Sequence, residues 1–151
     1  MQAPQPKPVP SKPAGGLIAS LHEHVRARLQ SDQFARHCEI ELLSISPGRA
    51  TARMTLHPHH LNGIGTVQGG AIFTLADFTF AAAANSHGTV AVAVNASITF
   101  MKPASTGTLW AEARDLDKKF KIGTYSIEIK DDQGDLIAHF QGLAYRKKDK
   151  L

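Results

Sequence analysis

The sequence predicts an α+β fold in which a mostly antiparallel sheet wraps around one long buried helix. Three observations lead to this prediction. The stretch from Gly70 to Ser86 is rich in alanine and holds one charged residue, Asp77, so about 17 residues can form a helix roughly 25 Å long that is buried on nearly all sides. Segments with the alternating pattern of β-strands lie on both sides of it. Those that follow it succeed one another as hairpins, which is typical of the α+β class.

Two helical or extended segments are expected before the sheet begins. Residues 1–16 are rich in proline and predict a disordered or polyproline-like tail. From residue 17 to about 34, apolar residues recur every four positions, which predicts an amphipathic helix packed on the sheet. The recurring residues are Leu17, Leu21, Val25 and Leu29.

Six strands complete the expected domain. Residues 40–45 and 49–56 are joined by the turn signal Pro47-Gly48 and predict a hairpin before the long helix. Four further strands are expected after the helix, with a hairpin turn at 132–135 between the last two. These strands are residues 89–101, 109–117, 123–130 and 136–146. One folded domain is therefore expected to span residues 17–147, followed by a solvated basic tail at 148–151.

Composition narrows the class of protein. With 151 residues, 42% hydrophobic and 20% charged, the chain has the size and composition of one globular domain. The single cysteine, Cys38, favours a reducing, cytoplasmic setting. No charge-free apolar run reaches the ~18 residues of a membrane span. The N-terminal segment has lysines but no apolar block beside them, so we do not expect it to be a secretory signal. The net charge of +4 is consistent with a polyanionic partner, such as the phosphates of coenzyme A, or with a surface charge that serves only solubility. Nucleic acid is not the expected partner, because the basic residues are dispersed along the chain.

Asp77 is open to two interpretations. A lone carboxylate in a buried helix is costly unless it is partnered or used. One interpretation is a structural acid that accepts hydrogen bonds from hydroxyl groups such as those of Thr74 or Thr79. The other is a catalytic carboxylate, because perturbed acids gather at functional sites.

Gly69 and Gly70 strengthen the catalytic interpretation. They immediately precede the helix, where the first amides have no intrahelical partner and the helix dipole favours negative charge. This arrangement predicts an oxyanion hole. Gly69 and Asp77 are eight positions apart, roughly 12 Å along one helix, whereas both groups should lie about 3 Å from the reacting atoms. Two copies packed antiparallel across a two-fold axis would bring Gly69 of one chain near Asp77 of the other.

Three histidines lie close together before the glycines. The segment His57-Pro58-His59-His60 raises a metal-site hypothesis. Pro58 stiffens the segment, and neither a helical i, i+4 histidine pair nor a cysteine accompanies it. Exposed loop imidazoles are therefore the favoured interpretation, and no metal is expected.

Several segments, taken in order, resemble a known family. They are residues 60–62, Gly65, residues 68–70, 75–77, 85–86 and 97–100, and they resemble the hot-dog-fold acyl-CoA thioesterases of the phenylacetate-degradation (PaaI-like) group over roughly residues 39–146. The resemblance implies a curved antiparallel sheet around a long helix and homodimers that pair their sheets edge to edge, often joined as homotetramers. It also implies a hydrolase that cleaves an aromatic or short- or medium-chain acyl-CoA, with no cofactor beyond the coenzyme A of the substrate.

The resemblance assigns roles to four residues. Asp77 matches the nucleophile or general base, and Gly69 matches the glycine whose amide polarises the thioester carbonyl. Asn62 matches the asparagine that holds the carbonyl or the attacking water. Gln68 stands where the family usually has histidine, and glutamine cannot take up a proton. This departure keeps open a non-catalytic acyl-CoA-binding or regulatory protein, whereas a hot-dog dehydratase would need an Asp–His pair that the sequence lacks near Asp77.

Substrate-binding residues are expected at the helix start, on the following strand and in a basic cluster. Some relatives place Ser or Thr at what corresponds to Ala93, and Asn95 or Ser97 can replace it only if their side chains face the site. Lysines at a strand end, together with Arg146, are candidates for binding the phosphates of coenzyme A. The expected substrate-binding residues are Gly70, Phe73, Asn95, Ser97, Lys118, Lys119 and Lys121.

Overall fold

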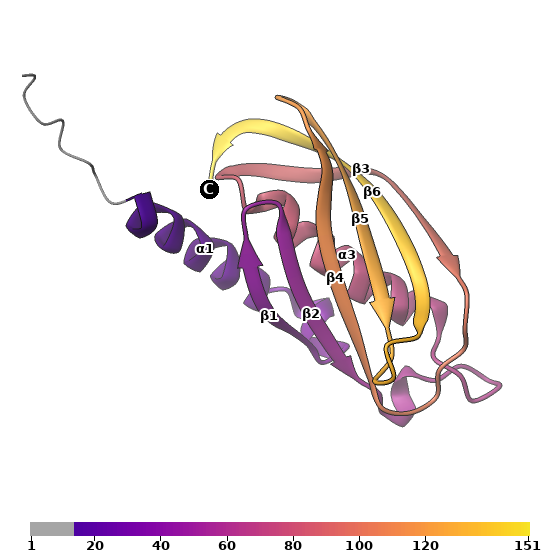
Figure 1. The fold of residues 1–151 in the computed structure, drawn as a ribbon. Coiled ribbons are helices and arrows are strands. Elements are labelled where there is room, and N and C mark those ends of the chain that lie inside the picture. Colours follow the sequence, from indigo (N-terminus) through magenta and orange to yellow (C-terminus); the bar gives the residue numbers. More distant parts are fainter. Residues whose placement is uncertain (1–13) are drawn as a thin grey trace, which may run out of the picture.

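The computed structural model describes residues 14–151, which form three α-helices, a short 3₁₀ turn and six strands. Figure 1 shows the strands curving around the long helix α3, with α1 extending away from them. The elements in chain order are α1 (Ala14–Gln30), α2 (Gln33–His37), β1 (Ile40–Ser46), β2 (Arg49–Thr55), the short 3₁₀ turn η1 (Pro58–His60), α3 (Gly69–Asn85), β3 (Thr89–Phe100), β4 (Thr108–Lys118), β5 (Ile122–Lys130) and β6 (Leu136–Lys150).

The six strands form one antiparallel sheet in the order β1-β2-β4-β5-β6-β3. The sheet is open, and β1 and β3 are its edge strands. Strand β3 follows α3 directly in the chain, yet it pairs with the last strand, β6. The predicted α+β fold, an antiparallel sheet wrapped around a long helix, is confirmed.

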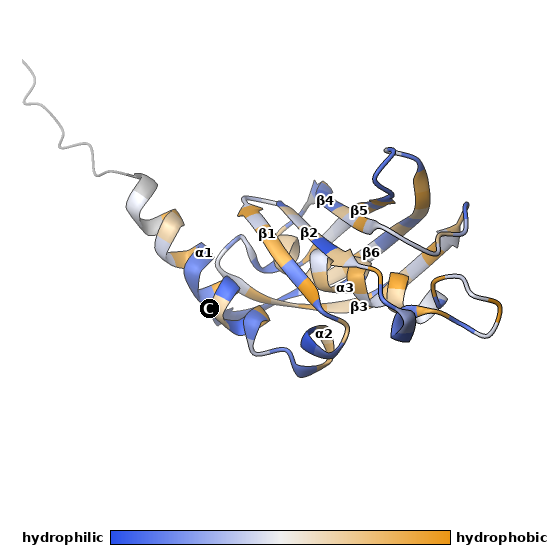
Figure 2. Cartoon of the chain, turned by 90° about the horizontal axis from the view of Figure 1, so that it is seen from below, coloured by the Kyte–Doolittle hydropathy of each residue, from blue (hydrophilic) through white to orange (hydrophobic). Residues whose placement is uncertain are grey.

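Helix α3 forms the centre of the core because apolar residues cover most of its circumference. It packs closely on the sheet at Gly142 of β6, where an added Cβ would lie 2.7 Å from Cζ of Phe80. Figure 2 shows that hydrophilic residues are prominent on α1 and α2 and scarce on α3. The buried residues of α3 are Ile72, Leu75, Ala76, Phe78, Thr79, Phe80, Ala82, Ala83 and Ala84.

The ends of the domain differ from the prediction. Helix α1 begins at Ala14, before the expected Leu17, and ends at Gln30. The expected helix is broken because the carboxylate of Asp32 accepts a hydrogen bond from the Ala35 N–H (3.0 Å) and so starts α2. Strand β6 continues to Lys150, which pairs with Thr89, so residues 148–150 extend the sheet. Residues 1–13 of the predicted tail lie outside the described residues.

Within residues 14–151, no helix has both the length and the apolar character needed to cross a membrane.

Candidate active site

Asp77 lies in the middle of α3, half-buried. The two hydroxyl groups expected to satisfy it are bonded elsewhere: Thr74 donates to the Gly70 carbonyl (2.7 Å) and Thr79 donates to the Leu75 carbonyl (2.7 Å). Among residues 14–151, no donor is hydrogen-bonded to the Asp77 carboxylate. The structural interpretation of this acid therefore loses the two donors proposed for it.

The pKa of Asp77 is raised above its ordinary value of 3.8. The larger cause is burial, which disfavours the charged form, and the smaller is the negative charge of Asp32 at the start of α2. A carboxylate with a raised pKa binds a proton more strongly once ionised, which suits a general base. The break between α1 and α2, which the sequence did not reveal, thus places a second acid near the first.

The amides at the start of α3 are divided between two tasks. Gln68 is the N-cap residue, and its side-chain oxygen accepts a hydrogen bond from the Gly70 N–H. Its backbone oxygen accepts from Ala71 N (2.9 Å). In the described part of the chain, no acceptor is bonded to the Gly69 N–H. Gly69 therefore has the amide that is available to an oxyanion, whereas the amide of Gly70, a predicted substrate-binding residue, is already used.

Gly69 borders a pocket at the sheet edge. An added Cβ on Gly69 would lie 3.0 Å from Cζ of Phe100, so the glycine allows this aromatic ring to approach the helix end. The edge pocket has a volume of about 360 Å³. It is lined by Thr66, Val67, Gly69, Ile72, Phe100, Met101, Lys102, Pro103 and Ala104.

A larger pocket, of about 580 Å³, lies between α2, η1 and α3, and we refer to it as the α2 pocket. Gln68, Gly70 and Phe73, which the sequence predicts as site residues, line it together. Asp77 follows Phe73 and Thr74 by one helical turn and so lies on the same face of α3. The remaining lining residues are Phe34, His37, Cys38, His59, His60, Ala71 and Thr74. Phe34, His37 and Cys38 were not expected there because the separate helix α2 is not visible in the sequence pattern.

Asn62 shapes the loop before α3. Its side-chain oxygen accepts hydrogen bonds from Ile64 N (3.0 Å) and Thr66 N (3.2 Å), and its amide nitrogen donates to Thr66 Oγ1 (3.0 Å). Gly65, with φ of 78°, completes the turn. Within one chain, Asn62 is thus a loop-forming residue, and its predicted contact with a carbonyl or a water stays a prediction.

Asn95 and Ser97 of β3 do not face α3 within one chain, and their assignment as substrate-binding residues stays a prediction. They pair with Leu143 and Gln141 of β6, on the face of the sheet turned away from α3. The reason is a β-bulge between Ala93 and Asn95. An inserted residue reverses the alternation of faces, so Ala93 faces α3 and Asn95, two positions later, does not.

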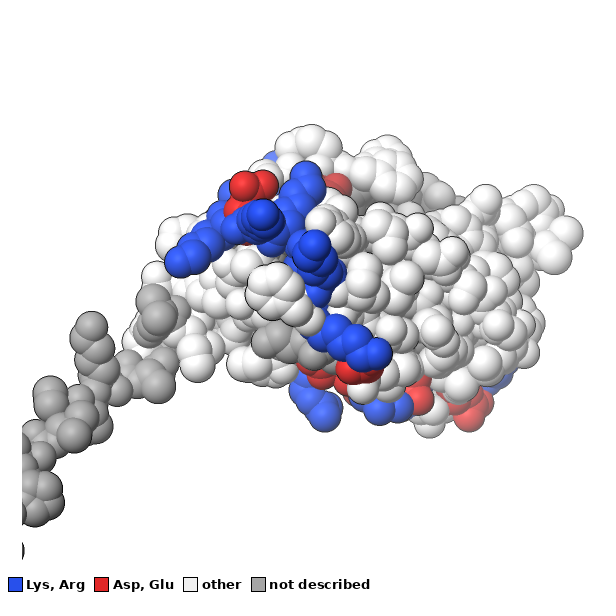
Figure 3. All heavy atoms as spheres, turned by 90° about the horizontal axis from the view of Figure 1, so that it is seen from above, with Lys and Arg blue, Asp and Glu red and all other residues white. Residues whose placement is uncertain are grey.

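The basic cluster lies at the turn between β4 and β5 and along the end of β6. Lys119 and Lys121 are exposed, and Lys119 Nζ lies 3.1 Å from Asp117 Oδ2. Figure 3 shows Lys and Arg side chains gathered on the face seen from above. Phe120, between these two lysines, is 89% exposed. Lys118 ends β4, and its side chain lies outside the described part of the structure.

Arg146 is not available to a phosphate, which corrects its place in that cluster. Its side chain is 6% exposed. The guanidinium donates to the Tyr125 hydroxyl (2.7 Å) and to the Lys119 carbonyl (2.7 Å). Arg146 therefore holds the β4–β5 turn against β6 and positions the exposed lysines.

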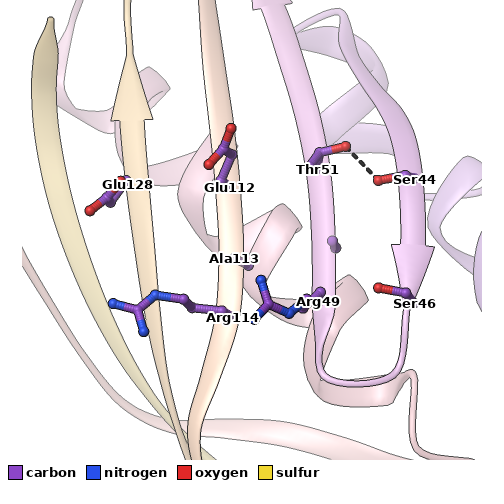
Figure 4. A pocket seen from close by; sticks show the side chains of 9 residues that line it. Ser44, Ser46, Arg49, Thr51, Glu112, Ala113, Arg114 and Glu128 are labelled. Atoms are coloured by element: carbon purple, nitrogen blue, oxygen red, sulfur yellow. Dashed lines mark hydrogen bonds between the residues drawn. The ribbon is translucent and has the colours of Figure 1, made fainter. Parts of the chain in front are cut away.

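A third pocket, of about 210 Å³, opens on the outer face of the sheet between β1, β2, β4 and β5. Figure 4 shows Arg49 and Arg114 side by side, with Glu112 and Glu128 farther along the strands and Ser44 bonded to Thr51 (2.7 Å). These side chains point away from α3. The pocket is therefore separate from the candidate active site.

Comparison with known proteins identifies the family. Residues 64–138 match the Thioesterase superfamily. The acyl-coenzyme A thioesterase PaaI of Escherichia coli is 36% identical over 125 residues, which cover 82% of this chain and 89% of that protein. The chain belongs to the thioesterase superfamily. Human acyl-coenzyme A thioesterase 13 is 36% identical over 94 residues, which cover 60% of this chain and 67% of the human protein.

Solved structures confirm the hot-dog fold of this superfamily member. The E. coli PaaI structure matches with a TM-score of 0.84 and 33% identity, covering 89% of this chain and 98% of that one. A hypothetical thioesterase protein of Streptococcus pneumoniae, solved with coenzyme A, matches with a TM-score of 0.77 and 17% identity, covering 83% of this chain and 98% of that one. The second match is a likeness of fold.

Proposed function

We propose that this protein hydrolyses acyl-CoA thioesters to a carboxylic acid and free coenzyme A. The observation that carries the proposal is Asp77, a half-buried carboxylate of raised pKa that has no hydrogen-bond donor among residues 14–151. The names of the E. coli and human relatives support the substrate class. The reaction needs no cofactor beyond the coenzyme A of the substrate, and the free thiol of Cys38 agrees with a proposed cytoplasmic location.

In the proposed reaction, the Gly69 N–H donates a hydrogen bond to the thioester carbonyl oxygen, where negative charge develops. Asp77 takes a proton from a water molecule whose oxygen attacks the carbonyl carbon. The carbon–sulfur bond then breaks, and the proton passes to the leaving thiolate. In the alternative route, the Asp77 carboxylate itself attacks the carbonyl carbon and displaces the thiolate. Water then hydrolyses the resulting anhydride in a second step.

We propose that the site is completed by a second copy of the chain. Gly69 and Asp77 are separated by roughly 12 Å along α3, too far apart to act on one carbonyl. Strand β3 has an unpaired edge in the described chain. Val94, in the middle of β3, is 55% exposed. Antiparallel pairing of two such edges would cover this apolar residue and continue the sheet across the dimer.

The same pairing supports a position for the coenzyme A phosphates. Phe100, beside Gly69, lies at the end of β3, and Thr89 lies at its start. In an antiparallel pair these two ends meet, so Gly69 of one copy would approach the basic end of β6 in the other, where Lys150 pairs with Thr89. Lys119 and Lys121 lie beside that end, and the exposed ring of Phe120 can stack on the adenine.

The alternative of a non-catalytic acyl-CoA-binding protein rested on Gln68. Its side-chain oxygen caps Gly70, a task that requires an acceptor and no proton transfer. This substitution is therefore compatible with catalysis. The deciding experiment is thiol release from a panel of aromatic and straight-chain acyl-CoAs. Release from at least one member supports hydrolysis, whereas tight binding of acyl-CoA with no release from any member would establish the binding protein.

A further inference from the structure

Three polar side chains converge beside the α2 pocket and take no part in the proposed reaction. The carboxylate Oε2 of Glu39 lies 3.3 Å from Nε2 of His57 and 3.9 Å from Nε2 of His59. The rings of His57 and His59 are nearly parallel, with an interplanar angle of 9° and centroids 5.8 Å apart. Both imidazoles are exposed, so their nitrogens can be reached from solvent.

His60 is not a candidate ligand but holds the other residues of this cluster in place. Its Nδ1 accepts a hydrogen bond from His57 N (3.0 Å), and its Nε2 lies 2.8 Å from the Cys38 carbonyl. Because Nδ1 accepts, the proton is on Nε2, which donates to that carbonyl. The ring is buried, and neither nitrogen has a lone pair to offer. His60 therefore fixes η1 against Cys38, the residue before Glu39, and holds His57 and His59 in place.

The backbone of Glu39 is a second, independent sign of function. Its φ of 56° is the one positive value among the non-glycine residues of the described chain. A non-glycine residue in this left-handed conformation is strained, and such strain collects at functional sites. Here the strained residue directs its carboxylate to the two imidazoles. Pro58, at the start of η1, stiffens the other half of the cluster.

We propose that Glu39, His57 and His59 bind a divalent transition-metal ion such as Zn²⁺. Zinc binds imidazole nitrogen and carboxylate oxygen at about 2.0–2.2 Å, which makes the edge of its tetrahedron about 3.4 Å. The distances from the Glu39 carboxylate to the two imidazole nitrogens, 3.3 and 3.9 Å, bracket this value. The exposed His57 and His59 side chains must rotate to bring their own nitrogens equally close, because their ring centroids are 5.8 Å apart. Water would complete the coordination sphere. The sequence alone favoured exposed imidazoles because no helical histidine pair or cysteine accompanies them. Glu39, eighteen positions before His57, is a partner that the spacing does not reveal.

The site is separate from thioester hydrolysis. Its ligands are different residues from Asp77, Gly69 and Asn62. Metal binding at this site therefore does not depend on whether the protein hydrolyses thioesters. His59 also lines the α2 pocket, so the metal would sit at the rim of that pocket. A first-row metal with a preference for nitrogen and oxygen ligands is expected, since no thiolate is part of the cluster.

The test is a Zn²⁺ titration of the full chain without an affinity tag, measured by competition with a chromogenic chelator. The expected result is one high-affinity site per chain. Removal of one ligand, in His57→Ala, His59→Ala or Glu39→Gln, should weaken binding by at least about tenfold, the lower end of the effect of disturbing a metal's supporting residues. His24→Ala, which removes an exposed imidazole of α1, is the matched control and should bind as the parent does.

Two results would overturn the proposal. One is the lack of a stoichiometric site in the parent chain. The other is equal affinity in the His59→Ala and His24→Ala variants, which would indicate dispersed surface histidines. A metal-dependent rise in melting temperature serves as a second measurement, because an ion that binds only the folded state stabilises it. This rise should disappear in Glu39→Gln, a variant that keeps the size of the side chain.

Discussion

The side-chain oxygen of Gln68 accepts the hydrogen bond of the Gly70 N–H. The first free amide of α3 thus belongs to Gly69, one residue earlier, and the cap fixes the direction in which it points. The residue that departs most from the family pattern is therefore part of the structure that presents the proposed oxyanion donor.

Removing this cap should affect both folding and catalysis. Gln68→Ala is expected to lower the free energy of unfolding by about 1 kcal/mol, the usual effect of losing a helix N-cap, and to lower kcat because the Gly69 amide is less well fixed. Gln68→His, which offers a nitrogen acceptor, should retain more activity than the alanine variant. Denaturant unfolding and steady-state thiol release measure the two effects. Equal activity of the alanine variant and the parent would contradict the positioning role.

Asp77→Asn should abolish turnover without destabilising the protein. Asparagine keeps the shape of aspartate but cannot act as base or nucleophile, so kcat should fall by about a hundredfold or more. The raised pKa of Asp77 means that ionisation is unfavourable in the folded state. Its contribution to stability is therefore full below the unfolded pKa and is lost as pH rises through the folded pKa. At neutral pH the neutral variant should melt at the same temperature as the parent or higher.

A lowered melting temperature together with retained kcat would contradict the catalytic role of Asp77 and indicate a structural acid. Measurement at low pH supplies the control. Below the unfolded pKa both proteins carry a neutral side chain at position 77, so any difference in melting temperature seen at neutral pH should shrink there.

Asp32→Asn should shift the acidic limb of the pH–rate profile. Asparagine caps helices about as well as aspartate, so α2 should persist while its negative charge is lost. Because that charge contributes to the raised pKa of Asp77, the pKa should fall, and kcat/KM should begin to rise at a lower pH than in the parent. Burial, the larger cause, remains, so the limb should stay above the ordinary value of 3.8. An unshifted limb would contradict coupling between the two acids.

Much of the fold was predictable from local patterns. The length and alanine content of residues 70–86 predict α3, and alternation predicts each strand. The position of β3 was not predictable in this way, because hairpin rules connect neighbours in the sequence, whereas β3 pairs with β6, beyond two intervening strands. That pairing makes β3 an edge strand.

The candidate site divides in the same manner. Asp77 and Gly69 could be found because a lone acid in an apolar helix and glycines before it are visible in sequence. The face of the sheet on which Asn95 and Ser97 lie could not be predicted, because one bulged residue in β3 reverses the alternation of faces and leaves no mark in the composition of the strand. Asp32 escaped notice because its influence on Asp77 depends on how α2 packs against α3.

The exposed lysines should act on the nucleotide end of the substrate. The double variant Lys119→Ala, Lys121→Ala is expected to raise KM for an acyl-CoA by about fivefold, from two exposed charge pairs of up to about 0.5 kcal/mol each, with kcat unchanged. KM for the matching acyl-pantetheine, which lacks the nucleotide, should not change. Lys130→Ala, a cation on the outer face paired with Glu128 (2.7 Å), is the control. Equal effects on both substrates would place the nucleotide elsewhere.

Val94→Lys tests the shared site. Val94 is 55% exposed at the bulge of the edge strand β3, and a lysine there should prevent a second sheet from pairing. The variant should behave as a folded monomer in light scattering and lose thioesterase activity, because Gly69 and Asp77 of one chain cannot reach the same carbonyl. Leu43→Lys places the same charge on the opposite edge strand, where the parent leucine is 39% exposed, and should leave assembly and activity intact. An active monomer would show that one chain contains the whole site.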